Sequence, residues 1–244
     1  MDLNNPENFG EVTHRIRSKP LLEDFYRGIY TRFIECRALC PKDGLAVELG
    51  SGAGFLREYD PAFIATDIIS YPDLDVVLDA TQMPFGNNQV SMFAMINTFH
   101  HIPDVARFLR EVERCLKPGG RLLMTDQHHG ILSSFILKHL HHEPYRPESD
   151  EWSFVSSGPL SGANGALPHI VFQRDRQRLA LEVPRLKLNY YRPHTPLQYW
   201  IAGGLKRWSM WPFRRPGAVH FLDHSLLRLS ENFGSFVDIE MTRI

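Results

Sequence analysis

The sequence predicts an α/β fold built on an open, mostly parallel sheet with helices packed against it. The run 45–47 is short and apolar, and it leads directly into a glycine-rich stretch at 48–54. Such a turn after a first strand is typical of open α/β sheets that hold a nucleotide-like ligand. The run 90–96 is largely apolar, as a parallel strand buried on both faces should be. Strand-like and helix-like segments alternate as far as residue 126, which is the pattern of a parallel sheet.

Length and composition are those of a single globular domain. The chain has 244 residues, enough to bury a full core, and we expect one domain across 1–244. Its net charge of −1 gives no electrostatic case for a nucleic-acid partner. The three cysteines match no zinc-binding spacing, which indicates reduced thiols. Because no stretch resembles a signal peptide or reaches the roughly 20 apolar residues that span a bilayer, we expect a cytoplasmic protein.

A helix is predicted ahead of the sheet. From Pro20 to about Leu39, apolar residues recur at helical spacing, and Pro20 suits a first helical turn. We expect 1–44 to form an N-terminal helical cap over the ligand pocket. The alternative is a helix that only packs against the sheet.

Four predicted strands have a polar side chain at or next to their ends. The strands cover 45–49, 63–66, 76–78 and 90–96, and the polar residues are Glu48, Asp67, Asp79 and Asn97. In open α/β sheets, ligands bind outside the carboxyl ends of the strands. We therefore expect these side chains to lie at one edge of the sheet and to line a single binding site.

The spacing of the glycine-rich stretch indicates which ligand it holds. The sequence is Glu-x-Gly-x-Gly-x-Gly, so it lacks the Gly-x-Gly-x-x-Gly spacing of dinucleotide sites and the Lys-Ser/Thr pair of a P-loop. An acid before the glycines suits a ligand with positive charge, such as the ammonium and sulfonium of S-adenosylmethionine. We expect that cofactor to bind at Glu48, Gly50, Ser51, Gly52 and Gly54. The alternative is a glycine-rich turn without a ligand.

Further cofactor contacts are predicted at the next strand ends. Asp67 lies 19 positions after the first acid, close to the interval of about 20 at which βαβ sites place a ribose-binding acid. We expect it to accept hydrogen bonds from both ribose hydroxyls, and Asp79 to accept one from the adenine amino group. Ala80 and Met83 would pack on the adenine ring, although Met83 suits a core position equally well. Asn97 completes the predicted cofactor-binding set.

The remaining helices and strands are predicted from the spacing of apolar residues and from the proline and glycine residues that separate them. A helix with one apolar face is expected from about 105 to 116, and the stretch 117–120 ends it. Two late strands would complete the sheet as its antiparallel edge pair. The further expected helices cover 131–140, 174–181 and 222–233, and the further strands cover 121–126, 186–190 and 236–241.

Residues 45–126 resemble the cofactor-binding core of the class I S-adenosylmethionine-dependent methyltransferases, in particular the type 11 branch. The landmarks are the acid–glycine stretch, Met-Pro-Phe at 83–85 and Leu-Lys-Pro-Gly-Gly at 116–120. The resemblance implies a Rossmann-like three-layer sandwich, with a mostly parallel seven-stranded sheet and an antiparallel edge pair. It also implies S-adenosylmethionine as methyl donor. One departure is a helix after Gly54 that is short for the family, which makes the approach to Asp67 abrupt.

The stretch 127–185 is predicted to be a substrate-side insertion over the strand ends, and 186–244 would complete the sheet. The insertion is too long for an ordinary connection, so we expect it to be functional. The chain is similar to uncharacterised methyltransferases of bacterial surface-polysaccharide gene clusters. That similarity implies methyl transfer to a small-molecule or saccharide acceptor. The alternatives are a non-catalytic, regulatory S-adenosylmethionine-binding protein and, less favoured, a dinucleotide-dependent oxidoreductase.

Histidines are the predicted catalytic residues. A hydroxyl or amine acceptor must lose a proton, and histidine is the side chain whose ordinary pKa suits that task. His128 or His129 is the first candidate base and His101 the second, because they follow the strands 121–126 and 90–96. The alternative for each is a packed or capping histidine.

No metal site is predicted. A group of histidines beside an acid could supply ligands, but it lacks the spacing of known metal sites and the His-Glu-x-x-His motif. Surface and hydrogen-bonding roles are the alternative. The residues concerned are His139, His141, His142 and Glu143.

The stretch 200–215 combines tryptophans with basic residues. Three of the chain's four tryptophans lie here, beside Lys206, Arg207, Arg214 and Arg215. Aromatic rings and cations together suit a membrane interface or a glycan. We expect peripheral membrane contact through this stretch, and the alternative is a buried segment that packs on the sheet edge.

Overall fold

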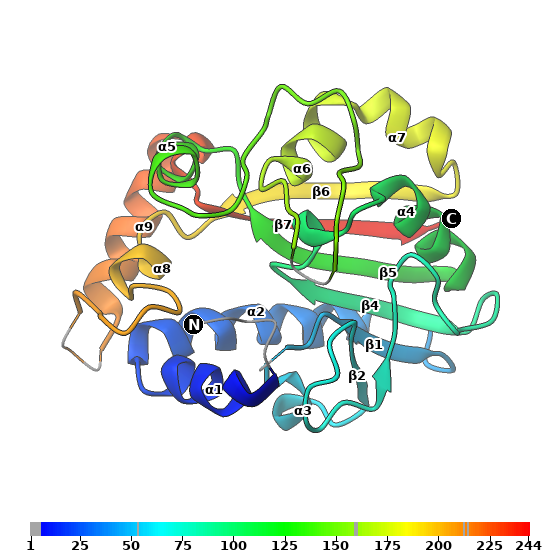
Figure 1. Cartoon of the computed structure of the whole chain (residues 1–244), viewed down its shortest axis with the longest axis horizontal. Helices are drawn as coiled ribbons and strands as arrows, with labels where there is room; N and C mark the ends of the chain where they lie inside the picture. The colour runs from blue at the N-terminus through cyan, green and yellow to red at the C-terminus, as the bar shows by residue number, and fades with distance from the viewer. Residues whose placement is uncertain (1–5, 53, 159–160, 212, 214) are drawn as a thin grey trace.

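The protein is built around a central sheet, seen in a computed structural model that describes residues 6–52, 54–158, 161–211, 213 and 215–244. In this part of the chain the sheet has seven strands in the order β3-β2-β1-β4-β5-β7-β6 (Figure 1). Strands β1 to β5 run parallel, and β7 runs antiparallel to both β5 and β6. The predicted parallel sheet with its antiparallel edge pair is confirmed. The strands are β1 (Leu45–Leu49), β2 (Phe63–Asp67), β3 (Val76–Val77), β4 (Val90–Ile96), β5 (Leu116–Gln127), β6 (Leu186–His194) and β7 (Phe236–Arg243).

Helices cover both faces of the sheet, which gives the expected three layers (Figure 1). On one face lie α1 (Phe9–Arg17) and α2 (Pro20–Ala38). On the other lie α4 (Val105–Cys115), α6 (Leu167–His169) and α7 (Arg176–Glu182). None of the helices in the described ranges is long and apolar enough to cross a bilayer. The remaining α-helices are α3 (Leu56–Tyr59), α5 (Ile131–His139), α8 (Gln198–Ile201) and α9 (Gly217–Leu229).

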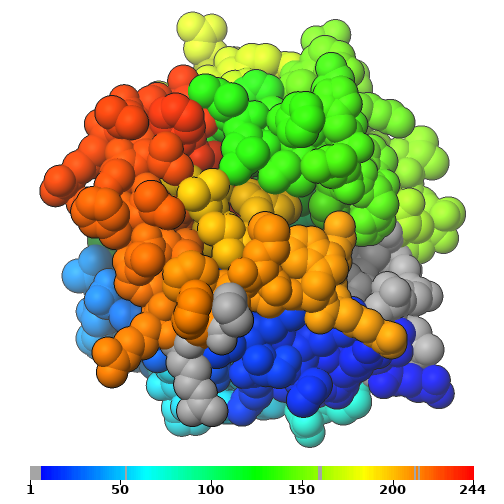
Figure 2. Space-filling model, turned by 90° about the vertical axis from the view of Figure 1, so that its left-hand side faces the viewer, coloured from blue at the N-terminus to red at the C-terminus, as the bar shows by residue number. Residues whose placement is uncertain are grey.

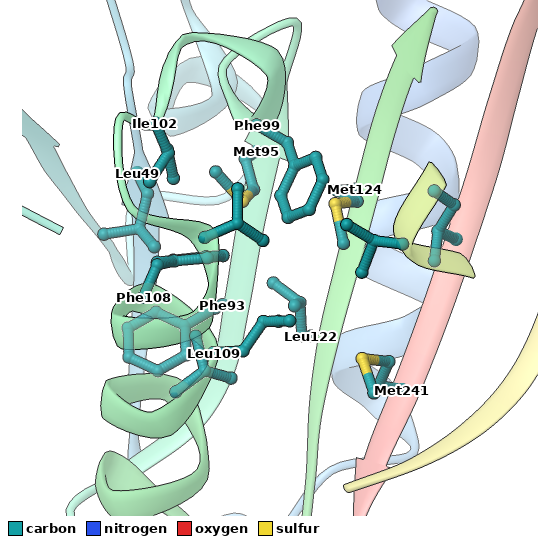
Figure 3. Packing of buried hydrophobic residues seen from close by; sticks show 14 of the residues in the cluster. Leu49, Phe93, Met95, Phe99, Ile102, Phe108, Leu109, Leu122, Met124 and Met241 are labelled. Carbon is teal, nitrogen blue, oxygen red and sulfur yellow. The ribbon is translucent and has the colours of Figure 1, made fainter. Parts of the chain in front are cut away.

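Each face of the sheet has its own apolar core, because successive residues of a strand point to opposite faces. Phe93 of β4 packs in one core with Leu122 of β5 and Phe108 of α4 (Figure 3). The strand neighbours of Phe93, Met92 and Ala94, belong to the opposite core with α2. All five residues are fully buried. The nearly unbroken apolar sequence of β4 is therefore explained by burial on both sides.

Several boundaries differ from the sequence-based expectation. Helix α1 was not predicted, and only Val12 and Ile16 are buried in it, too few for a clear period. Strand β5 begins at Leu116. Residues 117–120, which were expected to form a turn after the helix, form the irregular start of this strand. Gly119 has φ +80° there, and the register with β4 shifts at this point. Helix α9 begins at Gly217 and not at residue 222, and β6 continues to His194.

Candidate active site

A large cavity lies at the carboxyl ends of the parallel strands. Its volume is about 1310 Å³, whereas a pocket for one small ligand usually measures about 300–1,000 Å³. The cavity therefore has room for two ligands side by side. The polar residues that the sequence predicts at one sheet edge all line it, namely Glu48, Asp67, Asp79 and Asn97.

The glycine-rich turn forms one wall of this cavity. Gly50 and Gly52 have φ values of +70° and +46°, which a residue with a side chain rarely adopts. A Cβ on Gly50 would lie 2.3 Å from the hydroxyl oxygen of Thr98, whereas a Cβ on Gly52 would meet nothing within 4 Å. Gly50 is thus required by packing, and Gly52 borders open space. Ser51 and Gly54 also line the cavity.

Glu48 carries a buried carboxyl group without a cationic partner. Its side chain is almost fully buried, and burial raises its pKa to about 7, with a further contribution from the nearby Asp67. A hydrogen bond with Ser51 opposes this shift. No described lysine, arginine or histidine nitrogen lies within 4.0 Å of the Glu48 carboxyl oxygens. A ligand with an ammonium group would supply the missing positive charge.

Two further carboxylates follow along the sheet edge. Asp67 is buried, and it accepts hydrogen bonds from the backbone N–H groups of Gly52 (2.9 Å) and Ile69 (3.0 Å). Burial raises the pKa of Asp67. Asp79 is exposed, and its Oδ1 accepts from both the backbone N–H and the hydroxyl of Thr81. Both carboxylates keep accepting capacity toward the cavity, which suits hydroxyl and amino donors of a ligand.

The other predicted cofactor-binding residues divide into two groups. Ala80 and Asn97 line the cavity. Asn97 has φ +50°, and its side-chain oxygen is buried without a hydrogen-bond partner among the described residues. Met83 does not line the cavity, because its side chain packs in the core shared with α4. Met83 therefore takes the core position that the sequence analysis gave as the alternative to a contact with adenine.

The structure separates the three predicted catalytic histidines. His101 lines the cavity, but His128 and His129 do not. His128 is buried, and its Nδ1 lies 3.0 Å from the Tyr191 hydroxyl. Burial lowers the pKa of both His128 and His129, the former to about 4. Neither His128 nor His129 is positioned to reach a ligand in this cavity.

A cluster that the sequence analysis did not predict joins His101 to His100 and Glu143. The Nε2 atom of His100 lies 3.3 Å from Glu143 Oε2, and the Nε2 atom of His101 lies 3.5 Å from Glu143 Oε1. The Nδ1 atom of His100 lies 2.6 Å from Asp126 Oδ1. The sequence indicated only part of this cluster, because His100 and His101 follow β4 and Asp126 lies at the end of β5. Glu143 comes from the insertion, and no local pattern connects it to these residues.

Charge differs sharply within this cluster. Burial disfavours a charged His100, but the carboxylates of Asp126 and Glu143 outweigh it and raise the pKa of His100 to about 10. Burial and the neighbouring His100 lower the pKa of His101 to about 4. Burial would raise the pKa of Glu143, but contacts with His100 and His101 lower it to about 2. At neutral pH, His101 therefore offers an uncharged imidazole to the cavity.

The remaining wall of the cavity is rich in apolar and aromatic side chains. Trp200 donates a hydrogen bond from Nε1 to the Ser235 hydroxyl at 2.8 Å and faces the cavity. Trp208 lines the cavity although 48% of it is exposed, so it lies near an opening. Arg214 of the predicted membrane-contacting stretch lies outside the described residues. Other apolar residues of this wall are Val12, Ile16, Tyr26, Tyr30, Ile136, Leu140, Tyr199, Met210 and Phe236.

Comparison with known proteins finds sequence similarity within the cofactor-binding part of the chain. Residues 47–124 match the family model described as "Methyltransferase domain". Over 56 residues the chain is 43% identical to phthiotriol/phenolphthiotriol dimycocerosates methyltransferase 1 of Mycobacterium ulcerans, which is 22% of this chain and 21% of that protein. Over 47 residues it is 45% identical to the uncharacterized protein YafE of Escherichia coli, 19% of this chain and 23% of that protein. The matches thus span under a quarter of the length of these relatives.

Solved structures share the fold over most of the chain. Geranyl diphosphate C-methyltransferase from Streptomyces coelicolor, solved with Mg²⁺, geranyl diphosphate and S-adenosyl-L-homocysteine, has a TM-score of 0.53 at 14% identity. The similarity covers 91% of this chain and 81% of that one. The complex between the Haloferax volcanii Trm112 methyltransferase activator and a methyltransferase also has a TM-score of 0.53, at 15% identity, covering 97% and 96% of the chains. At such identities these likenesses establish the fold.

Proposed function

We propose that this chain, whose residues 47–124 match a methyltransferase domain, transfers a methyl group from S-adenosylmethionine to an acceptor and that both ligands bind in the one cavity. The observation that carries the proposal is the cavity itself. Its volume of about 1310 Å³ exceeds the need of one ligand. We assign the acid–glycine wall to the cofactor, and the part lined by His101, Glu143 and aromatic side chains to the acceptor.

The residues at the strand ends fit the cofactor. We assign Glu48 to the methionine ammonium, because its buried carboxyl group lacks a cation within the described chain. The open space beside Gly52 admits the ligand against bare backbone. Asp67 would accept from the ribose hydroxyls, and Asp79 from the adenine amino group. When bound, S-adenosylmethionine supplies a methyl group activated by sulfonium.

The chain's own contribution to methyl transfer is alignment, exclusion of water and handling of a proton. Alignment of the acceptor with the methyl group accounts for most of the barrier reduction in such a displacement. Helices α1 and α2 and residues 141–144, 156, 158 and 161–163 contribute walls to the cavity and would exclude water. Of the predicted bases, we assign the acceptor's proton to His101, the one that lines the cavity.

The acceptor class follows from the lining of the far wall. Tyr199, Trp200 and Trp208 offer aromatic faces, on which sugar rings and apolar chains both pack. We propose a lipid-linked saccharide as acceptor, with the saccharide near His101 and the apolar part toward the opening at Trp208. The relative named above from Mycobacterium ulcerans, a dimycocerosates methyltransferase, is consistent with an amphiphilic acceptor. A place in surface-polysaccharide synthesis would follow.

We further propose that the protein works at the cytoplasmic face of a membrane. Exposed apolar side chains gather on α5, α9 and the segment between α8 and α9, which lie together on one side of the molecule (Figure 2). Lys206, Arg207 and Arg215 add positive charge to this surface, named here the apolar–basic face. Its exposed apolar residues are Ile131, Phe135, Leu140, Trp208, Met210, Phe213, Phe221, Leu222 and Leu229.

Two measurements test the proposed function. Calorimetry should show tight binding of S-adenosylhomocysteine and none of NAD, which would exclude the oxidoreductase alternative. Turnover of radiolabelled S-adenosylmethionine on a panel of lipid-linked and free saccharides should then identify an acceptor. Cofactor binding without turnover on any acceptor would favour the non-catalytic regulatory alternative. Binding of NAD in preference to S-adenosylhomocysteine would overturn the proposal.

A further inference from the structure

We propose that His100, His101 and Glu143 form a binding site for one divalent transition-metal ion, at the end of the cavity that we assign to the acceptor. The binding of the metal is independent of the proposed function, whereas its role in catalysis rests on it. Residues 99–101 form a 3₁₀ turn two residues after the end of β4, and Glu143 comes from the insertion. His100 is buried, and the other two side chains are mostly buried.

The distances between the three side chains match a shared metal ion. One ligand atom from each residue lies within 4.8 Å of the others. The contacts from Glu143 to His100 and His101 measure 3.3 and 3.5 Å. Two ligand atoms that lie about 2.1 Å from one tetrahedral metal ion are themselves about 3.4 Å apart. The distances from Glu143 to the two imidazole nitrogens are therefore those of ligand atoms around a common metal ion.

Both imidazoles are oriented for metal binding by acceptors on their other nitrogen. His100 Nδ1 donates to Asp126 Oδ1 at 2.6 Å, and His101 Nδ1 donates to the carbonyl oxygen of Gly162 at 3.2 Å. A carbonyl oxygen cannot donate, so the proton of His101 must be on Nδ1. Both rings thus turn Nε2 toward Glu143. An acceptor behind each histidine is the usual support of metal-binding imidazoles.

The contact between His101 and Glu143 lacks a positive charge. With its proton on Nδ1, His101 presents a lone pair at Nε2 to a carboxylate oxygen 3.5 Å away. A proton on His100 Nε2 would serve only the other contact, and Glu143 Oε2 makes no hydrogen bond that meets full geometric criteria in the described chain. Gln127 Nε2, at 3.4 Å from His100 Nε2, adds no positive charge. A metal ion between the three ligands would displace the proton from His100 Nε2 and satisfy both contacts together.

The ligand set indicates the class of metal and its role. Two histidines and one carboxylate bind Zn²⁺ in catalytic sites and Fe²⁺ in oxygenases, in both cases with coordination positions left open. The open positions would face the cavity, because all three ligands line it. A hydroxyl or phosphate oxygen of the acceptor would bind there. Coordination lowers the pKa of a bound hydroxyl, so its proton can pass to solvent before the methyl group arrives. In the metal-bound protein His101 would therefore act as a ligand, which replaces the role of base assigned to it above.

Metal titration of the untagged protein tests the site. After dialysis against a chelator, Co²⁺ should bind at one equivalent, with the visible absorption of low-coordinate cobalt, and Zn²⁺ should displace it. His101→Asn and Glu143→Gln should each weaken Co²⁺ binding at least tenfold. His139→Ala, which removes an exposed histidine outside the cavity, should leave the affinity unchanged. Circular dichroism and binding of S-adenosylhomocysteine serve as checks of folding.

The outcomes separate this inference from the proposed function. No saturable Co²⁺ binding by a protein that still binds S-adenosylhomocysteine would overturn the metal site and leave the methyltransferase proposal in place. Equal affinity in the wild type and in both ligand variants would also overturn it, because the metal would then bind elsewhere. Metal binding that both variants lose, with folding retained, would support it.

Discussion

At the scale of single residues, the cavity combines two kinds of charge environment. Glu48, Asp67 and Asp79 lie at the end that we assign to the cofactor, and no described basic side chain pairs with them within 4.0 Å. At the other end, Glu143 is surrounded by histidines. A cationic ligand is therefore favoured at the first end, whereas the second end suits an acceptor that binds through oxygen. This division agrees with a cofactor and an acceptor side by side.

Glu48 predicts a pH dependence of cofactor binding. Because burial raises its pKa to about 7 in the free protein, the carboxyl group is mostly neutral below that pH. If it binds the ligand's ammonium, affinity for S-adenosylhomocysteine should fall as pH drops below 7, approaching tenfold per unit. Calorimetry from pH 5.5 to 8.5 measures this, and Glu48→Gln should flatten the profile. An unchanged slope in that variant would refute the assignment.

Asp67 predicts a loss of cofactor affinity without a loss of fold. Asp67→Ala removes the proposed ribose acceptor, and an unmade hydrogen bond to a charged group costs about 1–3 kcal/mol, roughly 5- to 150-fold in Kd. The backbone N–H of Gly52 also loses its partner, so urea denaturation should accompany the calorimetry. Asp150→Ala, in an exposed loop, is the matched control. Equal affinity in both variants would place the ribose elsewhere.

Replacement of His101 should lower the rate of methyl transfer without changing cofactor affinity. His101→Ala should lower the rate of methyl transfer by about 10²–10⁴-fold, the usual contribution of a proton-transfer group, while binding of S-adenosylhomocysteine is retained. Single-turnover kinetics with an identified acceptor measures it. His128→Ala and His129→Ala serve as comparison variants, because neither histidine lines the cavity. A larger defect in either of these than in His101→Ala would reinstate the first candidates from the sequence.

At the scale of elements, predictability followed the strength of local periodicity. Helix α2 spans Pro20–Ala38, almost as expected, because eight of its residues are buried at helical spacing. Helix α1 has two buried residues and was missed. The glycine turn could be predicted, since φ values of +70° and +46° strongly favour glycine. The partner of His101 could not, because Glu143 reaches it only through the folded insertion.

Helix α4 predicts a stability contrast between its two faces. Phe108 is fully buried between the helix and β4 (Figure 3), so Phe108→Ala should lower the free energy of unfolding by about 3–5 kcal/mol. Arg110 on the exposed face forms an ion pair with Glu182, and its replacement by alanine should cost under about 1 kcal/mol. Urea denaturation measures both. Similar losses would contradict the assigned orientation of the helix.

At the scale of the whole molecule, the cavity is assembled from segments far apart in sequence. Helix α1, the strand ends, the insertion and the segment after α8 each contribute a wall. The sequence identified the strand-end wall because its motif is local. The tryptophan-rich stretch was expected either at a membrane or in the core, and the structure has Trp200 and Trp208 on the cavity wall. The division into cap, core, insertion and C-terminal part remains a prediction.

The apolar–basic face predicts salt-dependent binding to anionic membranes. Each basic residue near an anionic surface contributes about 1 kcal/mol, and salt screens this attraction. We expect the protein to co-sediment with phosphatidylglycerol-containing vesicles at low salt. A variant with Lys206, Arg207, Arg214 and Arg215 all replaced by glutamine should bind at least tenfold more weakly. The matched control carries glutamine at four basic residues outside this face, Arg107, Arg110, Arg178 and Lys187, and should bind like the parent. Equal, negligible binding of all three proteins would refute the proposed membrane contact.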